Sequence, residues 1–436
     1  MTSDLSQHES FVYWLHRPFF DLTPAGEGPL SAHGPLVALQ DMDGSVGLGM
    51  QHCYGERFRV SLLRESGLAG YAGRHPAETA DHLRTAPWRL LCEWVQEFPS
   101  LGVAHQVRVL RLLVALSFHR LVLQLCPPCP GEDEETATRA LMRAFAEYTL
   151  KTEAGIRERP RALEEVARAA PARSMVRHTA AMILLTDAAK VRRDLERATY
   201  YRAQAAESLG GEPLDADGFR NALLVSRFYR GASFVPYLAG DTGQVETEMD
   251  IAEDVIRHAR PAGPVEAVLA RESLFFVTES RMREAQWRKD HRLAQARARD
   301  LTVLDPWNAK AHIEYGEVLF TTGNVEAAAV EFQQAARLAP PGRCVALFLL
   351  GQCREALGDP QRACDAYLRS LQVDPLGVST TMGVVRTAAA AGLAAVRRWG
   401  EQRLQELVQM GVSPERVEVG PGRGRPRPRG ASRWAP

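Results

Sequence analysis

The feature of this sequence that most restricts its fold is a repeat with a period of 35 residues in the C-terminal half. Glycine, alanine, an aromatic residue and proline return at this spacing in two consecutive units: Gly316 and Gly351, Gly323 and Gly358, Ala328 and Ala363, Phe332 and Tyr367, Pro340 and Pro375. Periods of about 20 to 50 residues are typical of repeat proteins, whose units bury their apolar faces against their neighbours. The spacing therefore predicts a stack of similar units.

Each recurring position fits a pair of antiparallel helices. We expect Gly316 where the backbone of the first helix approaches its partner, and Gly323 in the tight turn that joins the two helices. Ala328 is small at the helix crossing, and Phe332 fills the space between units. Proline disfavours a helical conformation in the residue before it, so the pairs at 305–306, 339–340 and 374–375 predict the ends of the second helices.

These residues resemble the tetratricopeptide repeat (TPR) family. In that family the first helix carries Leu-Gly, the turn carries Gly-Asp or Gly-Asn, and the second helix carries Ala and an aromatic residue before Asp-Pro. The matching residues are Tyr315-Gly316, Gly323-Asn324, Ala328 and Phe332, then Leu350-Gly351, Gly358-Asp359, Ala363 and Tyr367. The resemblance is clear over residues 306–376 and looser over 215–410, with Phe219–Ala259, Pro264–Leu304 and Val378–Gln409 as the further helix pairs.

The predicted fold class is mainly α: an antiparallel helix-hairpin (TPR-like) α-solenoid with a small β-containing N-terminal region. Apolar residues at three- and four-residue spacing predict helices over 76–98, 103–125, 134–157 and 178–209. An Asp-Gly turn at 43–44 between short apolar runs predicts a β-hairpin. We divide the chain into an N-terminal region (1–75), a helical domain (76–210), TPR-like repeats (211–410) and an Arg/Pro/Gly-rich tail expected to be disordered (411–436).

The TPR resemblance also implies a ligand surface, because the first helices of such repeats line a concave groove. The groove positions are Lys310, Ile313, Glu317, Phe320, Val345, Phe348, Gln352 and Glu355. Family members that bind a C-terminal carboxylate carry Lys and Asn where this chain has Ile313 and Glu317, so that clamp is absent. We expect an apolar or basic ligand, with Phe320 and Phe348 as anchors and the two glutamates as counter-charges.

Cys126-Pro-Pro-Cys129 is the single Cys-x-x-Cys sequence in the chain. A zinc half-site is one interpretation, but it requires two more ligands, for which His52, Cys53, Cys92 and His119 are candidates through tertiary approach. We favour a proline-rich helix terminator. No phosphate-loop, metalloprotease or complete dinucleotide-binding sequence occurs, and we expect no cofactor.

The C-terminal tail contains Arg423-Gly-Arg-Pro426, which resembles the core of an AT-hook, an extended segment that binds the narrow minor groove of A·T-rich DNA. Arg423, Arg425 and Arg427 are therefore candidate DNA-binding residues. A disordered tail produced by codon bias is the alternative, because 49 of the 53 basic residues are arginine, as in a GC-rich bacterial genome.

The whole chain has 53 basic and 53 acidic residues, so its balance excludes a general polyanion binder. The N-terminus lacks a signal-peptide pattern and no apolar run is long enough for a membrane helix, so we expect a cytoplasmic protein without a membrane partner. The leading hypothesis is an intracellular adaptor that binds a protein or peptide in the groove. The alternatives are a DNA-associated regulator that uses the tail, and an enzyme with its site in residues 1–210.

Overall fold

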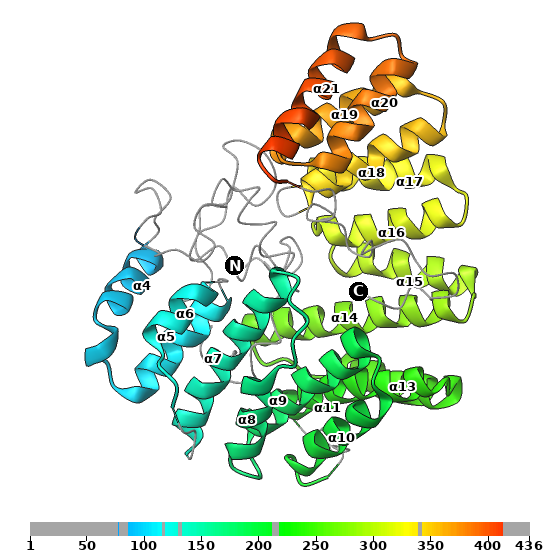
Figure 1. Cartoon of the computed structure of the whole chain (residues 1–436). Helices are drawn as coiled ribbons and strands as arrows, with labels where there is room; N and C mark the ends of the chain where they lie inside the picture. The colour runs from blue at the N-terminus through cyan, green and yellow to red at the C-terminus, as the bar shows by residue number, and fades with distance from the viewer. Residues whose placement is uncertain are drawn as a thin grey trace, which may run out of the picture.

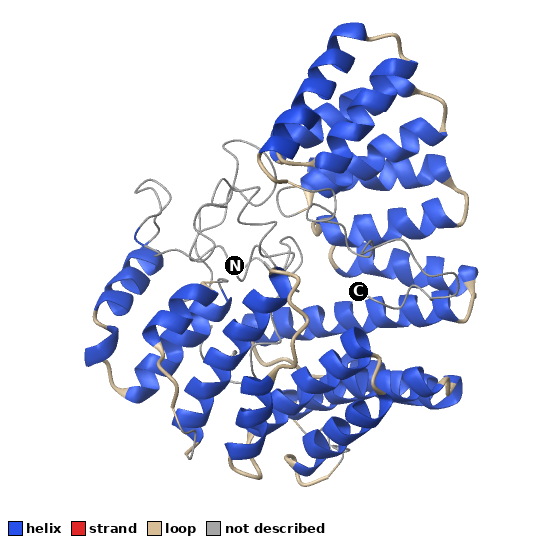
Figure 2. Cartoon of the chain, in the orientation of Figure 1, coloured by secondary structure: helices blue, strands red, loops and turns tan. Residues whose placement is uncertain are grey.

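The structure is a computed structural model that describes residue 77 and residues 86–115, 118–129, 133–211, 218–338 and 342–412. The described residues form helices joined by short turns and contain no strand (Figure 2). The mainly α, solenoid-like fold class is thereby confirmed. The β-hairpin predicted around 43–44 and the Arg-rich tail lie outside the described residues.

The N-terminal part of the array contains helices of very different lengths. They are α4 (Ala86–Gln96), η7 (Phe98–Ser100), α5 (Val103–Ala115), α6 (His119–Leu125), α7 (Glu134–Glu153), α8 (Arg161–Ala169), α9 (Met175–Thr186), η8 (Asp187–Arg192) and α10 (Leu195–Glu207). The prediction of one helix over 178–209 is wrong, because a π-helical turn follows α9. Arg193 then takes a left-handed conformation, and Asp194 caps α10 by accepting a hydrogen bond from the Arg197 amide at 3.0 Å. The sequence pattern also did not predict α8.

The C-terminal part consists of helix pairs. They are α11 (Phe219–Ala232) and the short α12 (Phe234–Ala239) with α13 (Thr242–His258), α14 (Pro264–Trp287) with α15 (His291–Leu304), α16 (Ala309–Thr321) with α17 (Val325–Arg337), α18 (Arg343–Ala356) with α19 (Pro360–Val373), and α20 (Val378–Ala390) with α21 (Ala394–Gln409). Figure 1 shows the helices following one another along an arc from α4 to α21. We call α14, α16, α18 and α20 the first helices.

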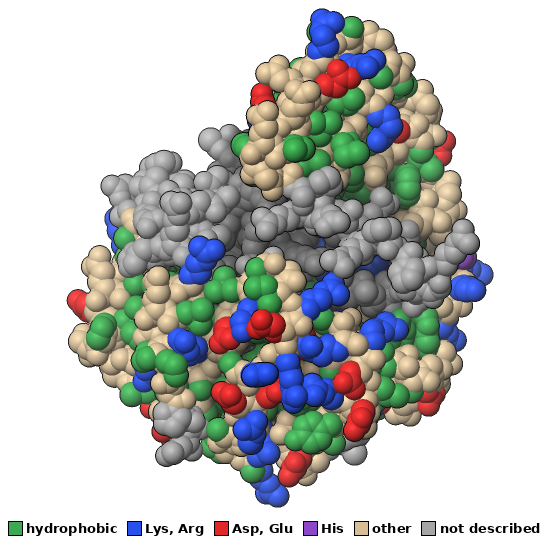
Figure 3. Space-filling model, in the orientation of Figure 1, with side chains coloured by type: hydrophobic (Ala, Val, Ile, Leu, Met, Phe, Trp, Pro, Cys, Tyr) green, Lys and Arg blue, Asp and Glu red, His purple; other side chains and the backbone are tan. Residues whose placement is uncertain are grey.

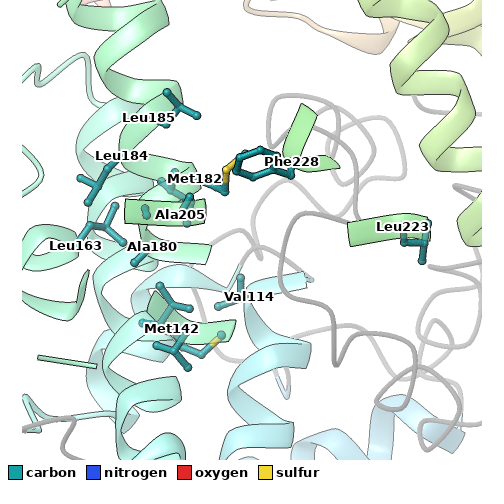
Figure 4. Packing of buried hydrophobic residues seen from close by; sticks show 14 of the residues in the cluster. Val114, Met142, Leu163, Ala180, Met182, Leu184, Leu185, Ala205, Leu223 and Phe228 are labelled. Atoms are coloured by element: carbon teal, nitrogen blue, oxygen red, sulfur yellow. The ribbon is translucent and has the colours of Figure 1, made fainter. Parts of the chain in front are cut away.

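One buried apolar cluster runs from Trp88 in α4 to Val318 in α16, and two smaller clusters continue through the last pairs. Figure 4 shows Met182 of α9 beside Phe228 of α11, and Leu163 of α8 beside Leu184 of α9. The large cluster passes across position 210, where the sequence suggested a domain boundary, and the division into domains stays a prediction.

The glycines of the repeat lie where the sequence analysis expected close approach. A Cβ atom at Gly316 would lie 2.6 Å from the Phe332 ring, and one at Gly351 would lie 2.5 Å from the Tyr367 ring. Gly383 of α20 faces the other edge of Tyr367, with a corresponding distance of 2.8 Å. Only glycine leaves room for these rings, so the aromatic residue of each second helix packs directly on the backbone of a first helix. The chain thus forms TPR-like hairpins.

The turns between paired helices share one backbone conformation. Gly240, Gly323, Gly358 and Gly392 all have left-handed φ angles, between +70° and +88°. Lys289 holds the equivalent position between α14 and α15 with φ of +61°. Side chains other than glycine are strained in this region, so the turn at Lys289 carries a conformational cost that the glycine turns avoid.

Candidate functional site

The predicted groove residues separate into two groups. Phe320, Phe348, Glu317 and Gln352 are partly exposed on the first helices α16 and α18. Ile313 is fully buried and Val345 is 9% exposed, and both pack in the apolar cluster between the helix pairs. For Ile313 the prediction of a ligand contact is corrected, because its side chain faces the core. Val345 offers almost no surface for the same reason.

Lys310 and Glu355, the two outer charges of the predicted groove, are engaged within the chain. The Lys310 ammonium donates a hydrogen bond to Glu279 Oε2 at 2.7 Å. Glu355 accepts two hydrogen bonds from Arg386, each 2.7 Å long, and one from the Tyr367 hydroxyl at 2.5 Å. Burial raises the pKa of Glu355, but the hydrogen bonds from Arg386 and Tyr367 outweigh it and the pKa is lowered. Glu355 is therefore already neutralised, contrary to its expected role as a counter-charge for a basic ligand.

Ion pairs between successive first helices have a common spacing. Glu279 with Lys310, Arg283 with Glu314, and Glu355 with Arg386 are each separated by 31 residues. This separation is about one helical turn shorter than the 35-residue period. Each pair therefore joins a residue of one first helix to a residue of the next that lies one turn before the equivalent repeat position. We call these three pairs the 31-residue ladder. It connects α14 to α16 and α18 to α20.

We call the contact between two successive first helices a step. The step between α16 and α18 has aromatic residues where the other steps have ion pairs. The residue 31 positions after Glu317 is Phe348, and within the described residues no ion pair of the ladder joins these two helices. Phe348 instead packs against Tyr367, with ring centroids 5.7 Å apart. Phe320 and Phe348 are both half-buried and border the same apolar cluster. This step therefore presents aromatic surface, flanked by the ladder on both sides.

The Cys-Pro-Pro-Cys sequence lies between α6 and α7. The Cys126 thiol is buried, and its sulfur lies 3.6 Å from the Arg139 carbonyl oxygen. The Cys129 sulfur lies 3.4 Å from the Thr136 carbonyl oxygen. Burial, together with the neighbouring Cys126, raises the pKa of Cys129. The described residues contain no group of three potential metal ligands, while His52 and Cys53 lie outside them.

The π-helical turn η8 aims a lysine toward an aromatic ring. Asp187 anchors this turn by accepting hydrogen bonds from Arg192 Nε at 2.5 Å and from the Tyr148 hydroxyl at 3.2 Å. The Lys190 ammonium lies 4.3 Å from the centroid of the Phe234 ring on α12. Burial, with the nearby Arg230 guanidinium as the second cause, lowers the pKa of Lys190 to about 7. The lysine is therefore only partly charged at neutral pH.

Arg230 of α11 is the second cation of this region. Its guanidinium carbon lies 5.6 Å from the centroid of Phe276, and the Lys310 ammonium lies 5.3 Å from the same centroid. In the described part of the chain, neither the Arg230 guanidinium nor the Lys190 ammonium makes a hydrogen bond or ion pair with a carboxylate. Arginine keeps its charge in proteins, so the burial of Arg230 is an electrostatic cost. Among the described residues, the Phe276 ring and longer-range attraction from Glu279 and Glu272 offset part of this cost.

Basic residues predominate slightly in this region, which we call the cationic cluster. It comprises Lys190, Arg227, Arg230, Arg283 and Lys310, with Glu272, Glu279, Glu314 and Glu317 as the carboxylates. Glu279 and Glu314 are bonded to Lys310 and Arg283. Lys190 and Arg230 are the members of this cluster whose close contacts in the described residues are aromatic rings.

Sequence reasoning missed the cationic cluster because its residues come from four elements that are not adjacent in the chain. Lys190 was assigned to the middle of a long helix, where a lysine is ordinarily solvated. The one signal available was that Lys190 is among only four lysines in an arginine-rich chain, and another of the four, Lys310, belongs to the same cluster.

The fold can be compared with solved structures. A crystal structure of the MamA protein is 15% identical, with 42% of this chain and 91% of that chain covered and a TM-score of 0.32. A signal-transduction ATPase with a tetratricopeptide repeat sensor from Pyrococcus horikoshii is 11% identical, with 83% and 55% covered and a TM-score of 0.47. The human IFIT1 dimer is 12% identical, with 94% and 99% covered and a TM-score of 0.29.

These similarities are distant, and all three TM-scores are below 0.5. The assignment of TPR-like hairpins therefore rests on the packing of glycines against aromatic rings in this chain. No family model matches the sequence, and comparison with curated proteins finds no match. Within the described residues, no helix has both the length and the apolar character needed to cross a membrane.

Proposed function

We propose that this chain is a protein-interaction scaffold whose first helices bind an extended peptide or helix of a partner protein. The observation that carries the proposal is the aromatic step between α16 and α18. There Phe320 and Phe348 are half-buried and Gln352 is partly exposed, on first helices whose neighbouring steps are fixed by the 31-residue ladder. Aromatic residues held on a rigid framework are the usual anchors of a binding surface.

Helical solenoids support this function physically. Each helix pair contacts mainly its neighbours, so the first helices form one continuous surface longer than any single pair. A scaffold accounts for the aromatic step without requiring a reaction.

Site-specific photo-crosslinking tests the proposal in the full-length protein. A photoreactive amino acid replaces Gln352 on first helix α18 or Val330 on second helix α17, which is 64% exposed. We expect Gln352 to give discrete adducts with one or a few proteins in cells that express the chain naturally. Val330 is the matched control and should give none of these adducts.

Substitution of the anchor completes the test. Phe320→Ala in the Gln352 crosslinking background should abolish the adducts while far-UV circular dichroism stays unchanged, because Phe320 only borders the apolar cluster. Adducts that form equally well from Val330, or that survive Phe320→Ala, would show that the partner binds elsewhere. The proposal for this surface would then fail.

A further inference from the structure

Two cations of the cationic cluster have no carboxylate partner among the residues that the structure describes. Lys190 and Arg230 are partly buried, yet each has only an aromatic ring as its close partner in the described structure. Elsewhere in the same cluster, Arg283 and Lys310 are bonded to carboxylates of the neighbouring helix. Buried charges are ordinarily paired, so two partly buried cations without a carboxylate among the described residues offer a place for an anion.

The geometry of the cluster restricts where that anion lies. Arg230 and Lys310 approach the same ring, Phe276, from α11 and α16. Lys190 approaches from η8, and a π-helical turn of this kind is frequently found at functional sites. The Asp187–Arg192 ion pair fixes η8 without engaging Lys190. The three cations therefore come from three elements: Arg230 and Lys310 share one ring of α14, and Lys190 lies on Phe234 of α12.

We propose that Lys190 and Arg230 bind a carboxylate of an acidic segment in a partner protein, presented beside an apolar side chain that contacts Phe276. This inference rests on the proposed scaffold function and names the chemistry of the partner. It differs from the ligand expected from the sequence, which was apolar or basic. Lys190 and Arg230 lie outside the eight groove positions that the TPR resemblance implied.

Charge balance favours a carboxylate over a polyanion. Lys190 and Arg230 can both interact with a single carboxylate, whereas successive phosphates of a nucleic acid would meet Glu279, Glu314 and Glu317. On the face visible in Figure 3, both basic and acidic side chains occur over the described helices. The low pKa of Lys190 adds a signature, because a bound anion stabilises its charged form and binding takes up a fraction of a proton near neutral pH.

Fluorescence anisotropy with the full-length protein tests the proposal. The probe is a fluorescein-labelled dodecapeptide of alternating glutamate and leucine, and its controls are the glutamine–leucine peptide, the phosphoserine–leucine peptide and a single-stranded oligothymidylate. We expect the glutamate peptide to bind more than tenfold more tightly than each control. Lys190→Met and Arg230→Gln should each weaken it by more than tenfold, whereas Arg220→Gln, an exposed arginine on the same helix as Arg230, should not.

Two further measurements keep the result unambiguous. Lys190→Met should melt no lower than the parent protein, because it removes a buried charge and keeps the apolar stem. Calorimetry in buffers of different ionisation enthalpy should show proton uptake for the parent and none for Lys190→Met.

Equal binding of the glutamate and glutamine peptides, or no binding at about 1 mM peptide, would overturn the inference. Tighter binding of the phosphoserine peptide or the oligothymidylate would overturn the assignment to a carboxylate. If the Gln352 adducts form but the peptide does not bind, the proposed scaffold function is supported and the proposed carboxylate site is refuted. If neither adducts nor peptide binding is observed, both proposals are refuted.

Discussion

Adding one methyl group at Gly351 should destabilise the repeat, and the structure gives the size of the effect. A Cβ atom at this position would lie 2.5 Å from Cε1 and 2.7 Å from both Cδ1 and Cζ of Tyr367. Carbon atoms pack best about 3.5 to 4.0 Å apart, so the ring would have to move by about 1 Å. The backbone of Gly383 blocks its other edge, and Glu355 holds its hydroxyl group at 2.5 Å.

The expected cost follows from two opposing effects. Overpacking a rigid core costs about 1 to 3 kcal/mol, while alanine in a helix is favoured over glycine by about 1 kcal/mol. Because Tyr367 is held on both sides, we expect the overpacking to win and Gly351→Ala to lose about 1 to 2 kcal/mol of unfolding free energy. Gly243→Ala in α13 is the matched control, since its Cβ would meet only Asp241 Oδ1 at 3.7 Å and it should be neutral or slightly stabilising.

Urea unfolding followed by far-UV circular dichroism measures this difference. Repeat arrays can unfold in segments, so hydrogen exchange supplies the local readout. Amides of α18–α20 should exchange faster in Gly351→Ala, and those of α11–α13 should not change. Tyr367→Leu should offset part of the loss when combined with Gly351→Ala, since the smaller side chain relieves the contact. A Gly351→Ala protein as stable as the parent, or strictly additive effects in the double variant, would refute the packing argument.

Three other predictions concern the turn, the ladder and the tail. Lys289→Gly should raise the unfolding free energy by about 1 kcal/mol by relieving a left-handed lysine, and a melting temperature that stays the same or falls would contradict this. Since the pKa of Glu355 is lowered in the folded state, its pairing stabilises the fold above the unfolded pKa near 4.5 and is lost as pH falls through the lower folded value. Glu355→Gln should therefore reduce the melting temperature at pH 7 more than at pH 3, and an equal loss at both would count against the ion pair. Replacing Arg423, Arg425 and Arg427 by alanine should leave the melting temperature unchanged and remove any low-salt binding to A·T-rich DNA, so binding that persists would locate the DNA site elsewhere.

The local features of the repeat could be predicted from the sequence, because they depend on residue size and backbone conformation at fixed spacing. Gly316 against Phe332, the left-handed turn at Gly323 and the helix end before Asp374 all follow this rule. The pairs around 219–259, 264–304 and 378–409 were also found at the predicted positions.

Features that depend on contacts between residues distant in the sequence could not be predicted in this way. The direction of Ile313 depends on how α16 rotates against α18, which a motif position does not fix. The π-helical turn at Asp187–Arg192 interrupts a run that has continuous helical periodicity. The partners of Lys190 and Arg230 come from different helices, so no sequence window contains them together.

The 31-residue ladder also limits how this chain can change in length. Each residue advances an α-helix by about 100°, so one residue inserted within α19 would rotate Arg386 away from Glu355 and break two hydrogen bonds at once. One residue inserted into the turn after Gly358 can be absorbed there, because turns tolerate added residues. Insertions and deletions in proteins descended from this one should therefore collect in the turns. The facing of the two ladder positions in space should be kept even where the two residues are replaced by a pair with the charges reversed.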